Sequence, residues 1–227
     1  MSEAVICFLL STLSTSYFNL ERGVVNFMKH MFVCPMDDVL KVAAVEEKGG
    51  VMYDAANFFN YTPPEAPLFP YVPAYLQQFY QQRKPFKQFL RDQFGSAFRP
   101  HDYLLALHDD ATDLEAHALS ELLIAGGARE TLMEYRAFLL ANEAEYISIT
   151  GSKRAITLTH VVSDKDDTER IFLPLNEAVP ETVTDAVHEL DPDRQLPIYT
   201  YDLPALIDGI GESVTTQDLA RNFLRIM

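Results

Sequence analysis

The apolar run at residues 103–107 (YLLAL) constrains the fold more than any other stretch of this 227-residue sequence. Five apolar residues in succession are typical of a strand that is buried on both faces of a parallel sheet. A helix is predicted to follow, because Thr112 and Glu115 have the spacing of a capping box and Gly126 comes after four apolar residues spaced for one helix face. A buried strand followed by a crossover helix predicts the α/β class of folds.

The same alternation of strands and helices is predicted from about residue 75 onward. A helix is predicted where Phe86, Phe89, Leu90 and Phe94 form an apolar stripe after Pro85. Strands are predicted over residues 5–13, 38–47, 51–53, 75–80, 129–134, 146–150 and 155–162, and a short helix over residues 137–141. We therefore expect a mixed sheet with helices on its faces.

The character of the sequence changes after residue 162. Residues 164–169 are strongly acidic, prolines recur, and only residues 203–210 and 216–227 look helical. The predicted division is therefore a sheet-forming core at residues 1–162 and an irregular, proline-rich acidic extension with C-terminal helices at residues 163–227.

The charge balance limits the classes of partner. The 18 lysines and arginines against 33 aspartates and glutamates give a net charge of −15, which would repel a nucleic-acid backbone. Two cysteines, Cys7 and Cys34, predict neither a disulfide framework nor a zinc site. No transmembrane segment or signal-peptide leader is expected, because the apolar run at residues 5–10 is short and has no basic leader. These features predict a cytoplasmic location.

Residues 110–130 (DATDLEAHALSELLIAGGARE) resemble a segment of the bacterial actin homologue MreB, a family of the actin–Hsp70 superfamily. The residues that fit the family pattern are Ala111, Thr112, Glu115, Ala118, Glu121, Gly127, Ala128, Arg129 and Glu130. The resemblance covers roughly residues 15–162. It implies an actin-like (ribonuclease-H-like) mixed sheet flanked by helices.

The resemblance also implies two phosphate loops, from which this sequence departs. The first, Asp-x-Gly-Thr, cannot be found over residues 13–23. The second falls at Ser148, Thr150, Gly151, Ser152 and Lys153, where Ser148 replaces the aspartate and only one glycine remains. Glycines matter at such loops because a Cβ atom blocks the approach of the backbone to a phosphate. Lys153 and Arg154 are expected in a solvated turn, and the alternative is that they attract an anion at the tip of the hairpin.

Two further departures concern hydrolysis and length. The family's hydrolytic glutamate falls at residues 135–137 (YRA), with Glu134 one position away. The sequence also stops where the family would need most of its second half. We therefore expect a degenerate, truncated member that has lost ATP hydrolysis, with residual nucleotide-binding residues only in the second loop.

The leading functional prediction is a non-enzymatic scaffold or adaptor without a cofactor. It would act through protein–protein contacts, self-association among them, in cell-shape or envelope assembly. One alternative is an ATP-binding, weakly hydrolysing actin-like protein. Another is a metal-dependent hydrolase that uses His108, Asp109 and Asp110, which follow a buried strand at its carboxyl end.

Overall fold

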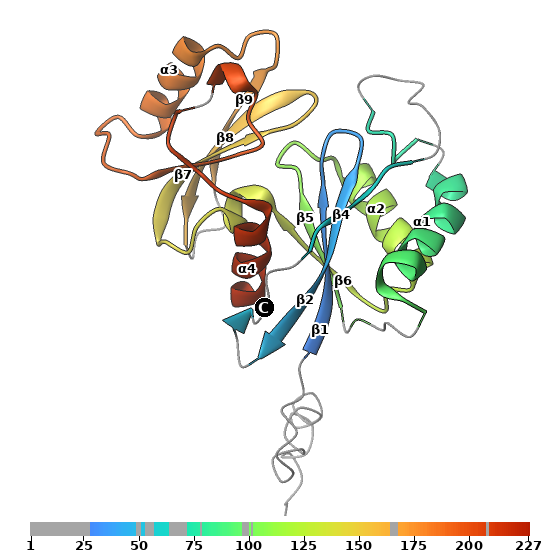
Figure 1. Cartoon of the computed structure of the whole chain (residues 1–227). Coiled ribbons are helices and arrows are strands. Elements are labelled where there is room, and N and C mark those ends of the chain that lie inside the picture. Colours follow the sequence, from blue (N-terminus) through green and yellow to red (C-terminus); the bar gives the residue numbers. More distant parts are fainter. Residues whose placement is uncertain are drawn as a thin grey trace, which may run out of the picture.

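The computed structural model contains two mixed sheets flanked by helices (Figure 1). It describes residues 28–48, 51–52, 57–63, 72–77, 79–96, 100, 102–163, 168–207 and 209–227. The strand predicted over residues 5–13 and the first phosphate-loop region at residues 13–23 lie outside these residues. Within the described part, no helix is long and apolar enough to cross a bilayer.

The first sheet contains six strands. They are β1 (Met28–Pro35), β2 (Leu40–Lys48), β3 (Val51–Met52), β4 (Phe59–Tyr61), β5 (Tyr103–Leu107) and β6 (Thr131–Tyr135). The order is β3-β2-β1-β5-β6, with β4 paired to β2. Strand β1 is antiparallel to β2 and parallel to β5, and β5 is parallel to β6. All five residues of β5 are buried, which confirms the prediction from the YLLAL run.

The two faces of the first sheet bury different partners. Met31 and Val33 pack with helices α1 (Phe79–Phe94) and α2 (Asp113–Gly126), whereas Phe32 and Cys34 pack with helix α4 (Thr216–Ile226) and part of the second sheet. This alternation follows from the period of two in a strand. Figure 1 accordingly shows α1 and α2 together beside the first sheet and α4 on the opposite side.

The predicted strand over residues 75–80 is wrong. Residues 74–77 form a turn, and α1 already begins at Phe79, so that Pro85 lies inside the helix instead of in its first turn. The apolar stripe extends the helix across the proline because Phe86 and Leu90 are buried against the sheet. Tertiary packing here outweighs the local preference of proline for a helix start.

The second sheet repeats the connectivity of the first. Its strands are β7 (Glu145–Gly151), β8 (Ala155–Val162), β9 (Glu169–Pro174), β10 (Ile198–Tyr201) and β11 (Glu212–Ser213), in the order β11-β10-β7-β8-β9. Strands β7, β8 and β9 are antiparallel neighbours, and β10 is parallel to both β7 and β11. The 3-10 turn η1 (Arg136–Leu139) connects the sheets, and α3 (Pro180–Leu190) and the 3-10 turn η2 (Ala205–Ile207) pack on the second one.

A mixed sheet with flanking helices is confirmed, but the predicted division at residues 162 and 163 is wrong. It falls between β8 and β9, which are hydrogen-bonded neighbours. The prolines that suggested an irregular extension lie at element ends: Pro174 ends the edge strand β9, Pro180 begins α3, and Pro197 precedes β10. Proline is compatible with all three places because none requires its missing N–H group.

The capping box predicted for Thr112 is present, and it allows a stability test. The Thr112 hydroxyl accepts a hydrogen bond from the Glu115 amide at 3.3 Å, and the Glu115 carboxylate accepts one from the Thr112 amide at 2.8 Å. We expect Thr112→Ala to lower the free energy of unfolding by about 1 kcal/mol in urea titrations. Thr184→Ala, at an exposed threonine inside α3, is the matched control and should change it by less than about 0.5 kcal/mol. Equal effects of the two substitutions would contradict the capping role.

Candidate functional site

The candidate site lies where corresponding turns of the two sheets meet. The β7–β8 turn contains the predicted residues Ser152 and Lys153. Because β7 and β8 take the same places in the second sheet as β1 and β2 in the first, this turn corresponds to the β1–β2 turn at residues 36–39 (MDDV). The Lys153 ammonium group contacts the Asp38 carboxylate across the two turns. We call this region, with η1 and Asp202, the inter-sheet site. The β1–β2 turn offers two aspartates but no glycine for a phosphate.

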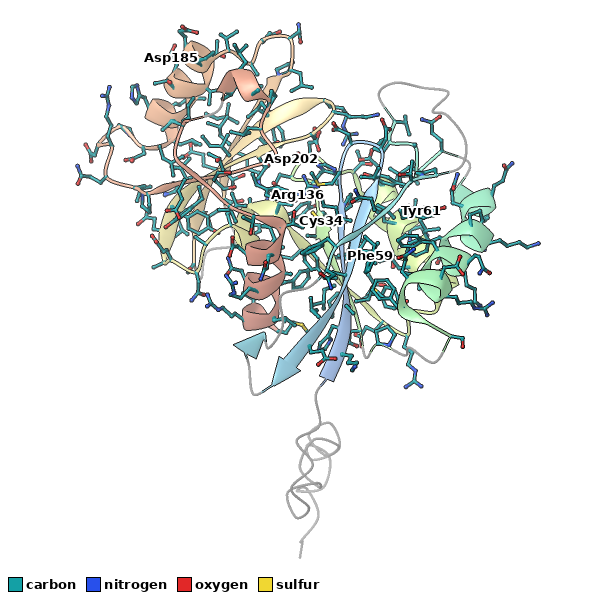
Figure 2. All side chains as sticks on the ribbon, in the orientation of Figure 1. Cys34, Phe59, Tyr61, Arg136, Asp185 and Asp202 are labelled. Atoms are coloured by element: carbon teal, nitrogen blue, oxygen red, sulfur yellow. The ribbon has the colours of Figure 1, made fainter. Side chains whose placement is uncertain are left out.

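Arg136 is the central side chain of the inter-sheet site. It is 0% exposed, and its Nη1 atom lies 3.4 Å from both the Asp202 Oδ2 atom and the Gly151 carbonyl oxygen. Its Nη2 atom lies 3.5 Å from the His108 Nε2 atom, and the guanidinium carbon lies 5.1 Å from the centre of the Tyr201 ring. Figure 2 shows Arg136 and Asp202 near the boundary between the two sheets. A buried cation therefore contacts groups from both sheets.

The backbone around Gly151 leaves no space for a side chain at this position. A Cβ atom on it would lie 2.0 Å from the Asp202 carbonyl oxygen, far closer than van der Waals contact allows. Asp202 itself has a positive φ of 59°, which directs its backbone against the end of β7. The space beside Gly151 is therefore filled by the backbone of Asp202.

The polar groups of the predicted nucleotide loop bind other parts of the chain. The Ser152 hydroxyl donates to Asp110 Oδ2 at 2.6 Å and accepts from the amides of Arg154 and Ala155 at 3.0 and 3.1 Å. The Thr150 hydroxyl donates to Asp109 Oδ2 at 2.5 Å. Ser148 is buried in β7, and its hydroxyl makes no hydrogen bond to the described residues. The structure thus places Thr150, Gly151, Ser152 and Lys153 in the inter-sheet site, where the chain's own groups hold them.

Arg154 is ion-paired, so the prediction of a solvated turn is wrong for it. Its guanidinium group donates to Asp110 Oδ2 at 3.0 Å and to the two Glu115 carboxylate oxygens at 2.9 and 3.0 Å. Burial opposes its charge, but the hydrogen bonds to Asp110 and Glu115 raise the pKa of Arg154 above its usual value. Because Glu115 also caps α2, this pair connects the β7–β8 turn to the first helix after β5.

His108, Asp109 and Asp110 do not converge on one point. His108 faces Arg136, Asp110 faces Arg154, and Asp109 accepts from the Ala137 amide at 3.0 Å as well as from Thr150. Across the described residues, no group of three or more histidine, cysteine, aspartate or glutamate side chains is arranged to hold a metal ion. The geometry of this triplet therefore favours interactions within the protein.

Burial dominates the electrostatics of the site. It lowers the pKa of His108 well below its usual value, and the neighbouring Arg136 lowers it further, so the imidazole is neutral at pH 7. Burial also raises the pKa values of Asp109, Glu134 and Asp202. The Glu134 carboxylate accepts a hydrogen bond from the adjacent Tyr135 amide at 2.7 Å. The sequence alone did not single out Arg136 or Asp202, since the two residues are 66 positions apart.

Gly151→Ala tests the close approach of the Asp202 backbone. We expect this substitution to lower the free energy of unfolding by more than about 2 kcal/mol, because a backbone carbonyl would have to move. Gly95→Ala is the control. Gly95 has a positive φ of 82°, and no atom of the described residues would lie within 4 Å of a Cβ at this position, so only the backbone strain of about 1 kcal/mol is expected. Urea unfolding measures the free energy of unfolding of both variants. If Gly151→Ala lowered it less than Gly95→Ala does, the close packing of the Asp202 backbone against Gly151 would be contradicted.

Asp109→Asn tests the buried carboxylate. An acid with a raised pKa in the folded state stabilises the fold below its unfolded pKa, and this contribution is lost as the pH rises through the folded value. The variant lacks that loss, so the stability of the variant relative to the unmodified protein should increase as the pH rises above the usual pKa of an aspartate. Asp185→Asn, on the exposed face of α3 (Figure 2), is the control and should show little pH dependence. A pH-independent difference for Asp109→Asn would contradict the assignment.

The sequence matches no protein-family model, and it matches no curated protein. Among solved structures, the ethanolamine utilization protein EutJ from Carboxydothermus hydrogenoformans has a TM-score of 0.54 at 12% identity over 87% of this chain and 88% of that one. A Ppx/GppA enzyme from Aquifex aeolicus has a TM-score of 0.42 at 10% identity, over 78% of this chain and 69% of that one. MreB5 of Spiroplasma citri, bound to ADP, has a TM-score of 0.42 at 13% identity, over 71% of this chain and 57% of that one. Together with the two mixed sheets, the likeness to EutJ shows that this chain has the actin-like fold.

Proposed function

We propose that this chain is a non-enzymatic actin-like scaffold or adaptor that works through protein–protein contacts. The observation that carries the proposal is the inter-sheet site itself, where Arg136 is fully buried and the Asp202 backbone fills the space beside Gly151. In the family that residues 110–130 resemble, the corresponding region holds the phosphates of a nucleotide. Here the same region is occupied by groups of the chain.

The backbone amides of the β7–β8 turn give a second argument. Phosphate-binding loops present free N–H groups to the ligand. In this turn the amide of Ser152 donates to the Ala155 carbonyl oxygen at 3.0 Å, and the amides of Arg154 and Ala155 donate to the Ser152 hydroxyl. A phosphate would have to displace these hydrogen bonds as well as the pairing of Arg154 with Asp110 and Glu115.

The cations of the site are also matched by carboxylates. Lys153 pairs with Asp38, Arg154 with Asp110 and Glu115, and Arg136 with Asp202. A triphosphate would compete with these carboxylates within a chain whose net charge is −15. We extend the proposal, through the resemblance to MreB, to assemblies that determine cell shape or build the envelope from the cytoplasmic side.

Thermal unfolding with nucleotides tests this proposal. A site with a dissociation constant of about 10 μM would gain roughly 2.7 kcal/mol at about 1 mM ligand, which corresponds to a rise in Tm of about 5–10 °C for a protein of this length. We expect Mg-ATP and Mg-ADP to shift the Tm by less than about 1 °C. A rise of several degrees would contradict the proposal and favour the ATP-binding alternative. The same measurement with Mn²⁺ and Zn²⁺ covers the hydrolase alternative, with His108→Ala as the control variant.

A further inference from the structure

Helix α1 differs in charge from the rest of the chain. Its 16 residues contain four basic residues, Arg83, Lys84, Lys87 and Arg91, and one acidic residue, Asp92, so it carries +3. The remaining sequence has 14 basic and 32 acidic residues and carries −18. Positive charge is therefore concentrated on one helix of an acidic protein, and the fold alone does not require this concentration.

Three of these basic residues form a stripe on the surface. Lys84, Lys87 and Arg91 are exposed and follow each other at i, i+3 and i+7, which places them on one helix face over about 10 Å. No hydrogen bond or ion pair to another described residue satisfies any of the three. Asp92, by contrast, accepts a hydrogen bond from Gln88 at 2.7 Å. We call Lys84, Lys87 and Arg91 the α1 stripe.

The helix dipole does not account for the α1 stripe. Cations are favourable near a helix C-terminus and acids near its N-terminus. In α1 only Arg91 lies in the last turn, and the first turn contains no acidic residue. Lys84 lies in the N-terminal half of the helix, where the dipole disfavours a cation.

A hollow adjoins the α1 stripe. It has a volume of about 390 Å³, and Lys87 and Arg91 line it together with Met31, Leu90 and Tyr103. The latter three residues are at most 7% exposed, so they form an apolar base under two charged side chains. This volume falls within the range of sites that receive a ligand or an anchoring side chain.

We infer that the α1 stripe and this hollow together bind an acidic segment of a partner protein that carries one large apolar side chain. The inference rests on the proposed function and names the chemistry of the partner. Carboxylates of the segment pair with Lys84, Lys87 and Arg91, and the apolar side chain enters the hollow between α1 and the first sheet. Hot spots of this kind combine a desolvated apolar anchor with charges at the rim.

The size of the α1 stripe favours a short acidic segment over an extended polyanion. The stripe is about 10 Å long, close to one Debye length at physiological salt. A bilayer of anionic lipid or a nucleic-acid strand would extend beyond it and meet the field of the remaining −18 charges. A peptide segment can remain within the stripe.

Fluorescence polarisation with the full chain tests the inference. The probe is a labelled peptide of about twelve residues with four glutamates around one phenylalanine, titrated between about 50 and 200 mM salt. We expect binding that weakens as salt increases and that Lys87→Glu with Arg91→Glu weakens by about tenfold or more. Lys87→Gln with Arg91→Gln removes the charges without reversing them and should weaken binding by a few-fold. The control, Arg194→Glu with Arg225→Glu, makes the same change of net charge far from α1 and should leave affinity within about twofold.

A second peptide with serine in place of phenylalanine tests the hollow and should bind at least about fivefold more weakly. Equal binding of both peptides, an equal loss in the control variant, or no binding at all would overturn the inference. The inference would also be overturned if the protein bound phosphatidylserine vesicles or a single-stranded oligonucleotide more tightly than the peptide, and if Lys87→Glu with Arg91→Glu abolished that binding. This test can be distinguished from that of the proposed function. If nucleotides raised the Tm while the peptide bound as expected, only the proposed function would be overturned.

Discussion

The buried guanidinium group of Arg136 is the interaction on which the arrangement of the two sheets depends. An unpaired charge in a protein interior costs several kcal/mol, so a fully buried arginine requires partners in fixed positions. On the side of the second sheet these partners are the Gly151 carbonyl, the Tyr201 ring and Asp202, which directly follows β10, whereas Arg136 directly follows the last strand of the first sheet. Separation of the sheets would leave the charge without these three partners.

Around Arg136 the contact between the sheets is polar, and it lies beside an apolar cluster that includes Phe32 of β1 and Tyr146 of β7. Asp109 joins the end of β5 to η1 and to Thr150 of β7, and Arg154 joins the β7–β8 turn to Asp110 and to the start of α2. Each of these bonds pairs a polar group of one segment with a group of another segment of the chain. The proposal that the chain serves as a non-enzymatic scaffold therefore rests on the same contacts that join the two sheets.

The sequence predicted those parts of the fold that local signals determine. Strand β5 and helix α2 could be predicted because a continuous apolar run and a capping box act within a few residues. Strands β7 and β8 were predicted as a hairpin, but strand β9, helix α3 and strand β10 of the second sheet were missed. Pro174, Pro180 and Pro197 resemble irregular chain until their places at the ends of these three elements are known. The β7–β8 turn was placed correctly, but the partners of its side chains come from segments far away along the chain. Tertiary contacts of this kind leave no periodic signal in one sequence.

Comparison of buried and peripheral cations by urea unfolding tests the central claim most directly. Arg136→Ala should lower the free energy of unfolding by at least about 3 kcal/mol. The substitution creates a cavity, and it leaves the buried groups that contacted the guanidinium group without their partner. Lys153→Ala, at the rim of the same site, should cost about 1 kcal/mol or less. If Arg136→Ala costs no more than Lys153→Ala, Arg136 does not hold the two sheets together and the account is wrong.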